Sequence, residues 1–215
     1  MHKSLYSLIL MDDVIKAIDR LALQQSTNRS NLVNQILAEY VSMTTPEKRV
    51  NNIFKSIEDL INQCDMNIIP YVSPNQMTMS LKSSLEYKYR PTIKYEVSLY
   101  RTPEQGAIGE INVVFRTQSA ELISAMTEFF RLWTRLESAY RHDVKIHYAL
   151  YEGRFTRSIN VLPHKNYTNE EISNNISSYI QIFDKLVKGY VSGAYSPRDL
   201  EMIYLEYYNK GVGLT

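Results

Sequence analysis

Hydrophobic and polar residues alternate at the start of the chain, over residues 3–10. A period of two predicts a β-strand, because successive side chains of a strand point to opposite faces. The two faces of this strand would carry Tyr6, Leu8 and Leu10, and Leu5, Ser7 and Ile9, respectively. A lone strand has no hydrogen-bond partner, so this segment must pair with another strand.

Two short helices are predicted directly after the strand. Apolar residues recur at helical spacing over residues 14–22 and again over residues 32–41. Asp12 and Asp13 would stabilise the start of the first helix, where carboxylates accept free N–H groups and face the positive end of the dipole. A short polar turn follows, and Ser30 is expected to be the N-cap of the second helix.

Neither apolar stripe can be buried by so short a unit, so we expect a second copy to cover both. The expected dimer core comprises Tyr6, Leu8, Leu10, Ile18, Leu21, Leu32, Ile36 and Tyr40. The segment resembles the ribbon-helix-helix family of the CopG, Arc and MetJ type. Residues 10–14 match its strand-to-helix junction and residues 28–32 match its turn, and the resemblance covers roughly the first fifth of the chain.

In that family a two-stranded ribbon enters the major groove of DNA, and the second helix binds a phosphate at its N-terminus. Carried over by position, the resemblance implies DNA contacts from Lys3, Leu5, Ser7, Ile9, Arg29, Ser30 and Asn31. It implies a homodimeric, sequence-specific DNA-binding protein that acts as a transcriptional regulator at a pseudo-palindromic site.

An alternative follows from the outward side of the strand. Leu5 and Ile9 can offer only apolar contacts, whereas direct readout relies on hydrogen bonds to base edges. The segment also has balanced charges, although phosphate neutralisation supplies most non-specific affinity. The rival hypotheses are a structural assembly protein that self-associates through this module, and a plasmid-maintenance or antitoxin protein that binds another protein.

The rest of the chain predicts a second domain, so we divide the sequence into residues 1–44 and residues 45–215. A third helix should begin at Pro46 with Thr45 as its cap. The later elements are expected as alternating strands within 67–117 with a loop at 103–106, a helix at 118–140, strands at 144–150 and 155–161, a helix at 168–188 ending at Gly189, and a last helix after Ser196. The predicted fold class is α+β, with a mainly antiparallel sheet covered by helices.

Composition limits the chemistry of this chain. Its 215 residues carry a net charge of +1, and 44% of them are hydrophobic, as in ordinary soluble proteins. Cys64 is the only cysteine, which fits a reducing cytoplasm, and no signal peptide or membrane span is expected. His142 and His147 form no metal-binding motif, and no nucleotide-binding or nucleophile motif is present. We therefore expect no enzyme activity, metal or cofactor.

A second basic and aromatic group is found in the later strands. Its members are Lys88, Arg90, Arg154, Arg157 and Lys165, with Tyr87, Tyr89, Tyr95 and Tyr100. Such a mixture can bind nucleic acid. Ordinary solvated surface is the favoured interpretation on an exposed sheet.

Overall fold

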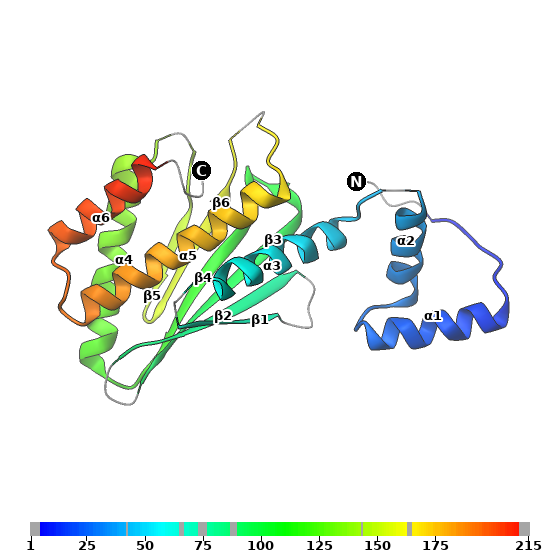
Figure 1. Ribbon diagram of the computed structural model, residues 1–215, viewed down its shortest axis with the longest axis horizontal. Coiled ribbons are helices and arrows are strands. Elements are labelled where there is room, and N and C mark those ends of the chain that lie inside the picture. Colours follow the sequence, from blue (N-terminus) through cyan, green and yellow to red (C-terminus); the bar gives the residue numbers. More distant parts are fainter. Residues whose placement is uncertain are drawn as a thin grey trace.

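The computed structural model describes residues 5–41, 43–64, 67–72, 77–86, 90–142, 144–162 and 165–210. These residues form an α+β fold of six helices and one six-stranded antiparallel sheet, which confirms the predicted fold class (Figure 1). The sheet has the strand order β1-β2-β3-β4-β6-β5. Its strands are β1 Ile68–Val72, β2 Thr78–Ser84, β3 Thr92–Glu104, β4 Ala107–Arg116, β5 Tyr148–Tyr151 and β6 Arg154–Asn160.

The long central hairpin pairs β3 with β4, and Tyr95 lies opposite Val113. The loop predicted at 103–106 is shorter than expected, because β3 continues to Glu104 and β4 starts at Ala107. Gln105 and Gly106 both have positive φ angles, 51° and 83°, which close the hairpin with a two-residue turn matching the strand twist.

Helices α3 Pro46–Asn62, α4 Ala120–Tyr140 and α5 Asn169–Val191 cover one face of the sheet, and α6 Pro197–Asn209 packs beside α4 and α5 (Figure 1). Phe183 of α5 lies at the centre of this core. Its ring is 5.3 Å from the ring of Phe129 and 5.7 Å from that of Phe155. The alternate strand residues Tyr95, Val97, Ile111 and Val113 are fully buried beneath the helices.

Side-chain caps set the helix starts that the sequence predicted. Thr45 caps α3, Thr168 caps α5 in a capping box with Glu171, and Ser196 does the same for α6 with Asp199. Each hydroxyl accepts an otherwise unpaired N–H of the first turn.

Two predicted boundaries in this domain are wrong. α5 continues through Gly189 to Val191, and the ring of Tyr195 lies so close to Gly189 that an added Cβ would be 2.0 Å from it. This glycine therefore provides packing space and does not end the helix. The strand expected at 144–150 is regular only from Tyr148, because at His147 the backbone N–H donates to the Ser158 hydroxyl.

The N-terminal unit consists of an extended segment at 5–11, then α1 Asp12–Gln24 and α2 Arg29–Tyr40. Figure 1 shows α1 and α2 standing apart from the sheet, at the N-terminal end of α3. An ion pair of 2.9 Å between Lys48 and Glu39 links α3 to α2.

The described part of the predicted first strand, residues 5–10, is not a strand in this single chain. The physical reason is that strand hydrogen bonds need a neighbour, and one copy offers none to this segment. Two helix starts also differ from the prediction. Asn28 caps α2 in place of Ser30, and Asp12 and Asp13 lie within the first turn of α1 without capping it.

Among the described residues, no helix combines the length and apolar composition needed to cross a bilayer.

Candidate functional site

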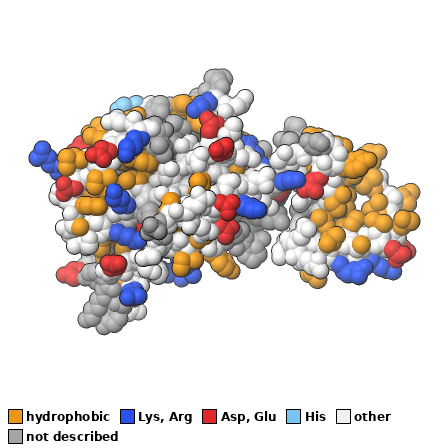
Figure 2. All heavy atoms as spheres, viewed as in Figure 1, with side chains coloured by type: hydrophobic (Ala, Val, Ile, Leu, Met, Phe, Trp, Pro, Cys, Tyr) orange, Lys and Arg blue, Asp and Glu red, His pale blue; other side chains and the backbone are white. Residues whose placement is uncertain are grey.

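The N-terminal unit buries very little apolar surface on its own. Ile18, Ala22 and Leu32 form its small core, with Val33 packed against them. The exposed apolar residues of the two helices include Val14, Leu21, Leu23, Ile36, Leu37 and Tyr40. Figure 2 shows hydrophobic side chains gathered over this unit. Two helices with so small a core are not expected to be stable alone, so this surface requires a partner.

The extended segment preserves the two faces that the alternation predicted. Leu5 and Ile9 are fully exposed, whereas Leu8 and Leu10 are only 51% and 37% exposed. Tyr6 lies between these extremes at 83%. The side of Leu8 and Leu10 therefore already turns toward the unit, although none of these residues reaches a core in one copy.

The predicted dimer-core residues fall into two groups in this structure. Ile18 and Leu32 are buried between α1 and α2. Leu21 and Ile36 are 43% and 44% exposed, and Tyr40 is 89% exposed. The second group remains available to another chain.

The predicted phosphate site at the start of α2 is already partly occupied by the chain itself. The Asn31 N–H donates to the Asn28 side chain at 2.9 Å. Arg29 donates two hydrogen bonds, of 2.7 and 2.6 Å, to the carboxylate of Asp19. Ser30 is exposed. Arg29 must therefore leave Asp19 before it can bind a phosphate bidentately.

The pairing of Arg29 with Asp19 sets the local electrostatics. Its hydrogen bonds lower the pKa of Asp19 and raise that of Arg29, so both groups stay charged at neutral pH. On the same helix, Lys16 lies 3.7 Å from Asp13. Lys3 lies outside the described residues. Within the described residues the unit thus offers little unbalanced positive charge for DNA.

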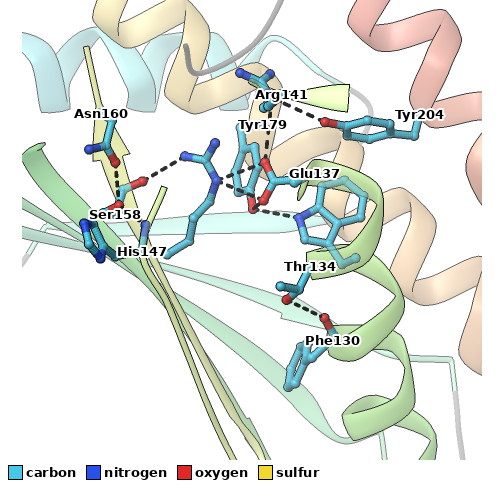
Figure 3. A network of polar contacts seen from close by, with 11 residues as sticks. Phe130, Thr134, Glu137, Arg141, His147, Ser158, Asn160, Tyr179 and Tyr204 are labelled. Atoms are coloured by element: carbon cyan, nitrogen blue, oxygen red, sulfur yellow. Dashed lines mark hydrogen bonds and ion pairs between the residues drawn. The ribbon is translucent and has the colours of Figure 1, made fainter. Parts of the chain in front are cut away.

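The C-terminal domain contains a buried polar cluster around Glu137 of α4 (Figure 3). Arg157 of β6 donates from Nε to both carboxylate oxygens of Glu137 at 3.0 Å. Tyr179 donates to the same carboxylate at 3.3 Å and accepts from Trp133 at 2.8 Å. Arg141 lies 3.9 Å from Glu137. The cluster joins α4, α5 and the sheet.

This cluster contradicts one sequence interpretation. Arg157 and Tyr95 were grouped with surface residues, but both are fully buried. The strand alternation puts Arg157 on the core face, between Phe155 and Ile159. Burial opposes the charge of Arg157, but Glu137 beside it outweighs that effect and raises its pKa. We interpret the cluster as a structural anchor between the helices and the sheet.

The remaining candidates for chemistry are weak. The described residues contain no group of three or more His, Cys, Asp or Glu placed to hold a metal ion. His142 and His147 are exposed, and the Cys64 thiol donates to the Leu60 carbonyl at 3.3 Å. An open hollow of about 550 Å³ is lined by Phe115, Arg116, Thr117, Gln118, Ile123, Glu152 and Gly153. It brings together no arrangement of catalytic groups.

Compared with protein-family models, curated proteins and solved structures, the chain matches none of them.

Proposed function

We propose that this protein is a homodimeric DNA-binding protein, a transcriptional regulator, whose residues 5–41 form a ribbon-helix-helix module with a second copy. One observation carries the proposal. The extended segment, α1 and α2 follow one another in the order of that family, and they leave their apolar faces without a partner. Pairing two copies would convert the extended segments into a ribbon and bury both helix faces.

The proposed dimer explains which apolar residues remain exposed. Leu8 and Leu10 on the inner side of the segment would cover Leu21 and Ile36 of the helices. Burying one such side chain contributes about 1.5–3 kcal/mol, so a handful per copy would make a stable dimer. The outer side, with Leu5, Ser7 and Ile9, would then face the DNA groove.

The dimer is tested first, by the mass of the full-length protein in solution. We expect Ile36→Glu to shift the mass from dimer to monomer, because it puts a charge in the proposed interface. Leu23→Glu is the matched control. Leu23 is 82% exposed and outside the proposed core, so this variant should stay dimeric. A wild-type monomer, or equal dissociation of both variants, would refute the dimer.

DNA binding is tested by titrating random duplex DNA over a series of salt concentrations. A steep loss of affinity with salt is expected if several phosphates are contacted. Ile9→Lys should strengthen binding, because it adds a cation to the face that meets the DNA, and Ser7→Ala should alter sequence preference without changing the dimer.

The assembly hypothesis predicts a different result for the same variants. The full exposure of Leu5 and Ile9 favours it, since these side chains could equally be covered by protein. In that case Ile9→Lys would dissolve the oligomer, and the wild type would not bind duplex DNA even at low salt. This outcome would replace the regulator proposal with a self-associating structural protein.

A further inference from the structure

The sheet has a second face, which we call the open face, on the side opposite α3, α4 and α5. Alternation assigns residues to it: Tyr95, Val97, Ile111 and Val113 point into the core, so their strand neighbours point the other way. The neighbours are polar or charged at most positions and half-buried or exposed, as with Lys94, Glu96, Glu110 and Asn112.

Charges on the open face are segregated along the strands. The register places Ile69, Lys82, Lys94, Val114, Arg154 and Tyr151 in one continuous row across all six strands. We call these residues the basic row. Arg116 follows two positions after Val114 on β4, and both open-face glutamates, Glu96 and Glu110, lie on the other side of the row. The row therefore contains cations and no anion.

Most cations at this end of the sheet are free to bind a ligand. Lys94 is paired with Glu96 at 2.6 Å, but Lys82, Arg116 and Arg154 are exposed and have no acidic partner within the described residues. With strands about 4.8 Å apart, Lys82 and Arg154 stand about 14 Å from each other along the row. This spacing fits a linear polyanion better than one small anion.

Aromatic side chains accompany the free cations. Tyr151 ends the basic row beside Arg154 and is 64% exposed. Tyr71 lies one row away on β1 and is 62% exposed. Exposed rings next to a line of cations on a flat surface can stack unpaired bases while the cations bind the phosphates. A duplex keeps its bases paired and would leave such rings unused.

We propose that the basic row binds single-stranded nucleic acid across the open face, with Lys82, Arg116 and Arg154 on the phosphates and Tyr151 against a base. This site is separate from the N-terminal module and does not depend on its function. It also differs from the basic group suggested by the sequence, because Arg157 and Tyr95 belong to the core.

The test uses the full chain and a fluorescein-labelled twenty-nucleotide oligo-dT, followed by fluorescence anisotropy over a salt series. The variant Lys82→Glu/Arg154→Glu should abolish binding. The salt slope of the wild type should exceed that of Lys82→Gln/Arg154→Gln by about 1.4, because each lost contact with a single strand removes about 0.7. Tyr151→Ala should weaken binding by at least about fivefold through lost stacking.

The matched control is Lys55→Glu/Lys185→Glu, which changes the net charge equally. Both lysines are exposed on the helical layer, away from the open face. This control should bind the oligonucleotide nearly as the wild type does, apart from a small loss from net charge. If the reversal of Lys82 and Arg154 prevents folding, judged by thermal melting, the neutral glutamine variant decides.

Three results would overturn the proposal. The wild type could fail to bind oligo-dT at low salt, the basic-row variants could bind it as the wild type does, or the control could lose as much affinity as they do. Random duplex DNA is measured in parallel. Equal loss of duplex and single-strand binding in the basic-row variants would also reject a site for single strands, whereas retained duplex binding would support it.

Discussion

Replacing Glu137 by glutamine tests whether the buried cluster anchors the helices to the sheet. The substitution keeps the side-chain volume and removes the negative charge. Arg157, with no exposed side-chain surface, would then lose the ionic partner that it contacts with two hydrogen bonds of 3.0 Å. A buried charge without a partner is costly, because the low-dielectric interior cannot replace its hydration.

The expected loss of stability is about 3 kcal/mol, at the lower end of the 3–5 kcal/mol typical for breaking a buried pair, because glutamine keeps one acceptor oxygen. The exposed pair of Glu128 and Arg131 provides the control. Its 2.6 Å contact is as short as any, yet both side chains are more than half exposed. Glu128→Gln should therefore cost less than about 1 kcal/mol.

Urea unfolding followed by tryptophan fluorescence measures both variants. Trp133 is the only tryptophan of the chain and donates a hydrogen bond to Tyr179 within the cluster, so it reports directly on this region. Adding Arg157→Met to Glu137→Gln should restore much of the loss, since an apolar pair needs no countercharge. If Glu137→Gln costs no more than Glu128→Gln, the anchoring role is wrong.

Two further predictions concern the remaining charged and titratable groups. Asp19→Asn should free Arg29 and, if α2 meets DNA, steepen the salt slope for random duplex DNA by about 0.9 per released contact; an unchanged slope would show that Arg29 does not reach phosphate. Burial raises the pKa of Tyr204 to about 12 from an ordinary value of 10, so its share of stability is full below pH 10 and declines as the pH rises toward 12. Tyr204→Phe should make the loss of stability in that pH range shallower by up to about 1.4 kcal/mol per pH unit, measured by urea unfolding at pH 9 to 11.

The sequence predicted the core of the C-terminal domain because its signals are local. Alternation at Tyr95 and Val97 marks a half-buried strand wherever it occurs, and a Thr-x-x-Glu pattern at Thr168 caps a helix in any context. The same local rule contained the position of Arg157, which shares its strand face with buried Phe155. Its identity as a basic residue was given more weight than its alternation, and that produced the wrong surface assignment.

Glu137 shows a similar unused signal. It lies on the apolar stripe of α4, four residues after Trp133, where a charged residue predicts a buried partner. The sequence did not identify that partner, because β6 approaches α4 only after the intervening chain has folded back on itself. The same limit applied to Gly189, whose glycine suggested a helix end until Tyr195 was seen to pack on it.

The sequence by itself determined the order of elements, the helix caps and the side of each strand that is buried. These properties depend on spacing within a few residues. The tertiary structure alone decided that Glu137 meets Arg157, that Asp19 holds Arg29, and that the basic row forms across six strands. Such contacts join segments distant along the chain, so only the register of the folded sheet and the packing of its helices bring them together.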